Sequence, residues 1–101
     1  MALHKVASKK ELLTGKAVSV NIENKTIALF NVGGKIYAMD NECTHAGAPL
    51  CEGELDGNVI TCPWHGATFD VTTGHVLGAP AFENLPSYKV IVEGDDITIE
   101  I

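Results

Sequence analysis

The chain has 101 residues, of which 46% are hydrophobic, a length and composition that fit one folded domain (residues 1–101) and exclude a disordered segment. Its formal net charge is −6, and residues 36–88 contain seven acidic side chains but no lysine or arginine, so nucleic acid is not an expected partner. No apolar stretch is long enough for a signal peptide or a membrane span, so we expect a soluble, cytoplasmic protein with no membrane partner.

The beginning of the chain predicts two short strands joined by a helical turn. Apolar and polar residues alternate over residues 3–6, which indicates a strand. Ser8 and Glu11 are spaced as in a capping box and predict a single helical turn that ends at Gly15. Residues 17–22 alternate in the same way and predict the second strand.

Most of the remaining chain has the pattern of β-hairpins. Gly33-Gly34, Thr72-Thr73-Gly74 and Gly94-Asp95-Asp96 each separate two runs of strand-forming residues. The predicted strands are residues 26–32, 35–39, 59–61, 67–71, 75–77, 89–92 and 97–101, with a turn at 56–58. Short strands without a long helical pattern indicate an all-β fold, either an antiparallel sandwich or an open barrel.

Two segments each carry one cysteine and one histidine: Cys43-Thr44-His45 and Cys62-Pro63-Trp64-His65. We call residues 43–47 the first hook and residues 62–66 the second hook. Two kinds of site fit two cysteines and two histidines: a tetrahedral zinc site, or a [2Fe–2S] cluster in which histidines replace two cysteines on one iron. Zinc modules usually pair like ligands, whereas each hook here mixes them, which favours the cluster.

The pattern C-x-H-x₁₆-C-P-W-H-G, with its flanks at residues 41–45 and 64–70, resembles the Rieske iron–sulfur family. The resemblance implies one [2Fe–2S] cluster, with Cys43 and Cys62 on one iron and His45 and His65 on the other. It also implies a Rieske-like fold in which a two-hairpin cluster-binding subdomain (43–66) is inserted into a base (1–42 and 67–101). In the family a proline-containing loop covers the cluster. Residues 78–80 match that loop, although Pro80 equally fits an ordinary strand terminator.

Four positions bear on the reduction potential. High-potential members of the family, those of quinol-oxidising complexes, carry a cysteine pair that bridges the hooks, and a serine and a tyrosine that donate to cluster sulfurs. The matching positions here are Ala48 and Trp64 for the pair, Ala67 for the serine and Phe69 for the tyrosine, and none supplies the required group. We therefore expect a potential low in the class range of about −150 to +300 mV.

Three other features have more than one interpretation. Cys51 is the third cysteine, and because the count is odd, a disulfide framework within the chain is excluded. Its side chain is expected to be a small, half-buried apolar group, with a redox-sensing thiol as the alternative. The acidic segment is either a solvated face or a field that steers basic partner surfaces toward the cluster. Trp64 either shields the cluster or contacts a partner.

Together with the resemblance, these features predict a low-potential Rieske ferredoxin, an electron carrier with no catalytic residues of its own. The family similarity implies a flavin-dependent ferredoxin reductase as electron donor and a terminal oxygenase as acceptor, and nothing predicts more than a monomer. Two alternatives stay open. One is a small Rieske subunit of a nitrite reductase, and the other, from a different class, is a structural zinc-binding interaction module.

Overall fold

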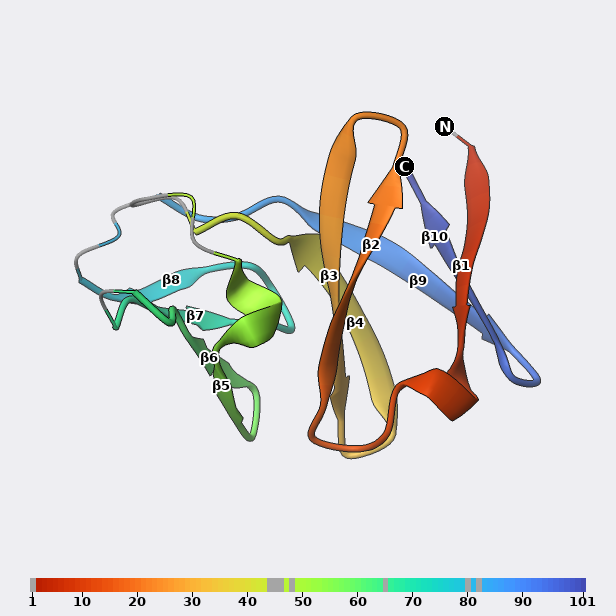
Figure 1. The fold of residues 1–101 in the computed structure, drawn as a ribbon, viewed down its shortest axis with the longest axis horizontal. Helices are drawn as coiled ribbons and strands as arrows, with labels where there is room; N and C mark the ends of the chain where they lie inside the picture. The colour runs from red at the N-terminus through yellow and green to blue at the C-terminus, as the bar shows by residue number, and fades with distance from the viewer. Residues whose placement is uncertain (1, 44–46, 48, 65, 80, 82) are drawn as a thin grey trace.

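The computed structural model describes residues 2–43, 47, 49–64, 66–79, 81 and 83–101, and in these it shows ten strands and two short 3₁₀ turns (Figure 1). The strands are β1 (Leu3–Ser8), β2 (Ala17–Ile22), β3 (Lys25–Val32), β4 (Lys35–Asp40), β5 (Glu54–Asp56), β6 (Val59–Thr61), β7 (Thr68–Asp70), β8 (Val76–Gly78), β9 (Ser87–Glu93) and β10 (Asp96–Glu100), and the turns are η1 (Lys9–Glu11) and η2 (Leu50–Glu52). Neither turn, nor any other helix within the described ranges, has the length and apolar character needed to cross a membrane.

Six strands form an antiparallel sheet in the order β1-β10-β9-β4-β3-β2. The sheet curls until its outer strands, β1 and β2, lie near each other, so it is a nearly closed barrel (Figure 1). The two ends of the described chain pair in this barrel, since Ala2 and Ile101 exchange backbone hydrogen bonds of 2.8 and 3.0 Å. The prediction of an all-β fold with an open barrel is confirmed.

A second antiparallel sheet, in the order β5-β6-β7-β8, stands beside the barrel. It is inserted between β4 and β9, which pair with each other in the barrel. Strands β5 and β6 precede residue 67 and strands β7 and β8 follow it, so this inserted sheet draws on both sides of the predicted subdomain boundary. The division of the chain into a base and a subdomain at residues 43–66 stays a prediction.

Strand β3 separates two cores. Ile27 and Leu29 face the barrel interior, whereas Ala28 and Phe30 face the inserted sheet, because successive residues of a strand point to opposite sides. Both faces are buried, which explains why this strand reads as a continuous apolar run. The core between the barrel and the inserted sheet also contains Met39, Cys43, Leu50, Ile60, Cys62, Ala67, Phe69 and Val71.

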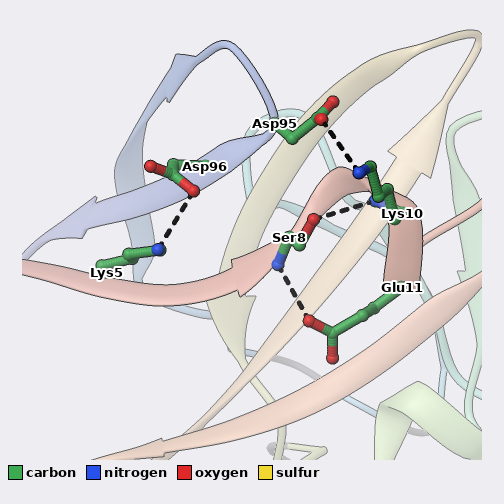
Figure 2. Close-up of polar contacts among 6 residues, drawn as sticks. All are labelled: Lys5, Ser8, Lys10, Glu11, Asp95 and Asp96. Carbon is green, nitrogen blue, oxygen red and sulfur yellow. Dashed lines mark hydrogen bonds and ion pairs between the residues drawn. The ribbon is translucent and has the colours of Figure 1, made fainter.

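The predicted capping box forms at η1 (Figure 2). The Ser8 backbone N–H donates to Glu11 Oε1 at 3.2 Å, and the Lys10 N–H donates to Ser8 Oγ at 3.3 Å. The turn ends at Glu11 rather than at the predicted Gly15: the next residue, Leu12, has a non-helical backbone (φ −130°, ψ 88°) and is fully buried in the barrel core. Two exposed ion pairs lie nearby: Lys5 of β1 with Asp96 of β10 at 3.1 Å, and Lys10 of η1 with Asp95 of the β9–β10 turn at 3.7 Å.

The predicted hairpins form around Gly33-Gly34, at residues 71–75 and at residues 94–95, with strand ends that differ from the prediction by at most two residues. The strand at residues 59–61 is confirmed as β6. Two elements were not predicted, β5 and η2, and each is only three residues long.

Candidate metal centre

The first hook follows β4, and Asn41 holds the residues between the two in place. The Asn41 N–H donates to the Thr26 carbonyl at 3.0 Å, and the Asn41 carbonyl accepts from the Leu50 N–H at 2.7 Å. The Asn41 side-chain Oδ1 accepts from the Cys51 N–H at 2.9 Å. Asn41 is only 6% exposed, so water competes little for these bonds. The residues that lead into Cys43 are therefore held between β3 and η2.

The second hook begins at the end of β6. Cys62 follows Thr61 directly, and its N–H donates to the Ala67 carbonyl at 2.7 Å, which joins the two ends of the hook. Gly53, just after η2, lies against the Thr61 carbonyl: a Cβ at this position would be 2.0 Å from Thr61 O. Only glycine allows this approach, so the segment that supports the first hook packs directly on the strand that delivers Cys62.

The described ends of the two hooks are joined by the same kind of backbone hydrogen bond. The Gly47 N–H donates to the Cys43 carbonyl at 2.8 Å, and the Gly66 N–H donates to the Cys62 carbonyl at 3.2 Å. Gly47 has φ +74° and Gly66 has φ +78°, a left-handed conformation that glycine adopts without steric cost. Each hook is thus a tight turn that starts at a cysteine and closes at a glycine four residues later.

The cysteines of the two hooks are buried in the same core. Cys43 and Cys62 are each 2% exposed, and both belong to the core between the barrel and the inserted sheet. Both lie in the described part of the chain, as does half-buried Cys51, and none of the three forms a disulfide. Thiolates are the usual protein ligands of iron–sulfur clusters, and a buried thiolate needs a metal or another positive partner. Two buried thiols on matching turns fit the sulfur ligands of one iron.

The two predicted histidine ligands, His45 and His65, lie outside the described residues, as do Ala48 and Pro80. Their assignment therefore stays a prediction. Of the other two histidines, His4 lies in β1 of the barrel and His75 in the β7–β8 turn.

Three of the four positions that bear on the reduction potential are described. Ala67 and Phe69 are fully buried in the same core as the two cysteines, so neither position brings a hydroxyl to that core. Trp64, by contrast, is 58% exposed although it lies inside the second hook. Its exposure favours contact with a partner over shielding of a cluster.

Carboxylates dominate the electrostatics of this half of the molecule. The side chains of Glu52, Glu54 and Asp56 are exposed on η2 and β5. Asp70 is different because the Thr72 hydroxyl (2.6 Å) and the Thr72 N–H (2.9 Å) both donate to its Oδ1. The Thr72 hydroxyl is the main cause that holds the pKa of Asp70 below its ordinary value of 3.8. Asp70 is therefore an ionised acceptor that organises the β7–β8 turn at neutral pH.

Sequence reasoning did not identify the supporting roles of Asn41, Gly53 and Asp70. The spacing of Asp70 and Thr72 is a turn signal that could have indicated their bonds. Gly53 gives no local signal, because its φ of −78° suits any residue and only the contact with β6 requires glycine. The contacts of Asn41 join residues that are distant in sequence, so they emerge only from the fold.

Comparison with known proteins assigns this arrangement. The chain matches the family described as "Rieske [2Fe-2S] domain" over residues 2–89. It is 43% identical over 91 residues to the "Naphthalene 1,2-dioxygenase system, ferredoxin component" of Pseudomonas aeruginosa, which covers 90% of this chain and 88% of that relative. The solved "Sphingomonas yanoikuyae B1 ferredoxin" is similar with a TM-score of 0.93 at 32% identity, covering 99% of both chains. A ferredoxin of similar structure also occurs in the "Complex of reduced oxygenase and oxidized ferredoxin in carbazole 1,9a-dioxygenase", with a TM-score of 0.91 at 35% identity, covering 96% of this chain and 91% of the matched chain.

A nearly closed barrel with an inserted sheet, with two hooks that start at buried cysteines, is the fold that this chain shares with a solved ferredoxin. The chain belongs to the Rieske [2Fe–2S] family, and it is homologous to the ferredoxin components of dioxygenase systems. The family match decides between the two metal sites that the sequence allowed, in favour of the [2Fe–2S] cluster over zinc. It also confirms the prediction of an electron carrier that serves a multi-component system.

Proposed function

We propose that this ferredoxin binds its one [2Fe–2S] cluster through Cys43 and Cys62 on one iron and through His45 and His65 on the other. The observation that carries the proposal is the equivalence of Cys43 and Cys62. Both are buried in one core, and the carbonyl of each accepts a hydrogen bond from a positive-φ glycine four residues later. A cluster-binding subdomain at residues 43–66, within a base of residues 1–42 and 67–101, is part of the same proposal.

The bound cluster supplies a one-electron couple, and its two neutral imidazoles give a less negative centre, which accepts an electron more easily than an all-cysteine cluster does. The protein tunes this couple through its surroundings. Ala67 and Phe69 offer no hydroxyl to the core of the cysteines, and carboxylates such as Glu42 lie on the same half of the chain. Both features disfavour added negative charge. We expect a potential low in the range of about −150 to +300 mV.

The proposed donor is a flavin-dependent reductase, and the proposed acceptor is a terminal oxygenase. The structurally similar ferredoxin seen in a complex with an oxygenase supports the acceptor. In this chain, exposed Trp64 offers a large contact surface beside the second hook, and the exposed carboxylates of Glu52 and Glu54 can steer a basic partner surface toward it. The protein would act as a monomer in the cytoplasm, where three cysteines without a disulfide are expected.

The test is the rate of electron transfer to an oxygenase. We would reduce the wild-type protein, mix it with the oxygenase component of a naphthalene 1,2-dioxygenase system, and follow reoxidation by stopped-flow absorbance at several salt concentrations. E54Q should lower the second-order rate constant severalfold at low salt and flatten its salt dependence. E93Q is the matched control, because Glu93 is also an exposed glutamate but lies at the end of β9 in the barrel. Equal effects of the two substitutions, or no transfer from the wild-type protein, would contradict the proposed docking.

A further inference from the structure

Three polar side chains form a chain of hydrogen bonds where the inserted sheet joins the barrel. Lys25 Nζ donates to Tyr88 Oη at 3.3 Å, and Tyr88 Oη donates to Asp40 Oδ1 at 2.5 Å. Lys25 Nζ also lies over the Tyr88 ring, 5.6 Å from its centroid. Lys25 starts β3, Asp40 ends β4, and Tyr88 lies near the start of β9, so these hydrogen bonds join three strands of the barrel.

The three side chains lie where the inserted segment leaves the barrel and returns to it. The chain leaves the barrel after Asp40 and returns to it at Ser87. The ladder between β4 and β9 has only two residue pairs, Ala38 with Tyr88 and Met39 with Ser87, followed by a hydrogen bond of 3.1 Å from the Asp40 N–H to the Pro86 carbonyl. The bond between Tyr88 and Asp40 adds a side-chain link across this short ladder. The strand end from which the first hook departs is therefore held by the strand on which the chain returns.

Lys25 and Asp40 carry opposite charges close to the first hook. Asp40 precedes Cys43 by three residues, so their Cα atoms are at most about 11 Å apart. This distance is about one Debye length at 0.1 M salt, so charges this far apart interact at low salt and are screened as salt is added. Lys25 brings a cation to the edge of a segment, residues 36–88, that has none of its own. A hollow of about 200 Å³, lined by Asn24, Lys25, Thr26, Asp40 and Glu42, lies at Lys25 and Asp40.

The protonation states suit this arrangement at neutral pH. Burial, followed by the hydrogen bond to the Asp40 carboxylate, raises the pKa of the Tyr88 hydroxyl above its ordinary value of 10.0, so it stays a neutral donor. The hydrogen bond to Tyr88, together with the charge of the Asp40 carboxylate, raises the pKa of Lys25, so it stays an ammonium group. At neutral pH Lys25 and Tyr88 thus keep the protonated states that their hydrogen bonds require.

We propose that Lys25, Tyr88 and Asp40 are positioning residues for the cluster. They fix the strand end from which the first hook departs, and the balance of their charges helps to set the reduction potential. This inference rests on the proposed cluster ligands. Removing the Asp40 charge should make an added electron more favourable, and removing the Lys25 charge should make it less favourable.

The test is a redox titration of purified holoprotein, followed by EPR, at low and high salt. D40N should raise the midpoint potential and K25M should lower it, and both shifts should shrink as salt is added. K35M is the matched control: Lys35 also lies over a tyrosine ring, 5.5 Å from the centroid of Tyr37, but at the opposite end of β4, about 17 Å from Asp40. Its potential should equal that of the wild-type protein.

A second variant tests whether Tyr88 holds the strand end from which the first hook departs. Y88F should speed the release of iron to a chelator severalfold and increase amide exchange at Asn41, whereas Y37F should change neither. Shifts of D40N and K25M in the same direction, a K35M shift as large as that of K25M, or iron release from Y88F at the wild-type rate would overturn the inference. A wild-type protein without a Rieske signal would instead overturn the proposed function, so the two failures are distinguishable.

Discussion

Replacing Asn41 with alanine should separate loss of the cluster from loss of the fold. The Asn41 Oδ1 accepts the Cys51 N–H at 2.9 Å, and the residue is 6% exposed. Without this acceptor a part-buried N–H is left unpaired, which costs about 1–3 kcal/mol. A domain of this size has a free energy of unfolding of about 5–15 kcal/mol, so N41A should still fold. The loss falls on η2 and on the chain just before Cys43, so the cluster site should loosen first.

Asn31 provides a matched control. It is 4% exposed, its Nδ2 donates to the Leu12 carbonyl at 2.9 Å, and its Oδ1 accepts the Gly34 N–H at 2.9 Å. These bonds stabilise the barrel, on the other side of β3 from the hooks. N31A loses two side-chain bonds where N41A loses one that the structure describes, so it should destabilise the fold at least as much.

The assay is guanidinium unfolding of the holoprotein, with far-UV circular dichroism reporting the fold and visible absorbance reporting the cluster. For N41A we expect the visible transition at a lower denaturant concentration than the circular dichroism transition. For N31A the two transitions should move down together. Coincident transitions in N41A, or separated transitions in N31A alone, would refute the role assigned to Asn41.

Three further predictions follow from the site. G53A should release iron faster than the wild-type protein in a chelator assay, because its Cβ would lie 2.0 Å from Thr61 O and overpacking of this kind costs about 1–3 kcal/mol; G94N, in an open turn, should behave like the wild-type protein. The pKa of Asp70 is lower in the folded state than its ordinary 3.8, so its contribution to stability is present above about pH 4 and is lost as pH falls through the folded value. D70N should therefore be less stable than the wild-type protein at pH 7, and the difference should shrink in circular dichroism melts toward pH 2. C51A should keep the wild-type iron and sulfide content on chemical analysis, and a loss of iron would show that Cys51 supports the site.

The local parts of the fold could be predicted from the sequence because their causes are local. Gly33-Gly34 sets a hairpin by its conformational freedom, and Ser8 with Glu11 sets a capping box by their spacing. The pairing of β1 with β10 and of β4 with β9 depends on contacts between distant residues, so no short pattern encodes it. The strand β5 is too short for its alternation to stand out from a turn.

The site shows the same division. Cys43 and Cys62 could be predicted as ligands because the hooks mix cysteine with histidine and end in glycine, and the structure places both side chains in one core. The residues that support them could not be identified in this way. Asn41 acts through η2, Gly53 through the Thr61 carbonyl, and Tyr88 through Asp40, and each of these contacts is made by the tertiary fold.

The central claim is that Cys43, His45, Cys62 and His65 hold a Rieske cluster. The most direct measurement is an EPR spectrum of the dithionite-reduced protein, together with iron and sulfide analysis. We predict a rhombic signal with a low average g value and about two irons and two sulfides per chain. A silent spectrum with zinc in place of iron, or the higher average g value of an all-cysteine cluster, would contradict the account.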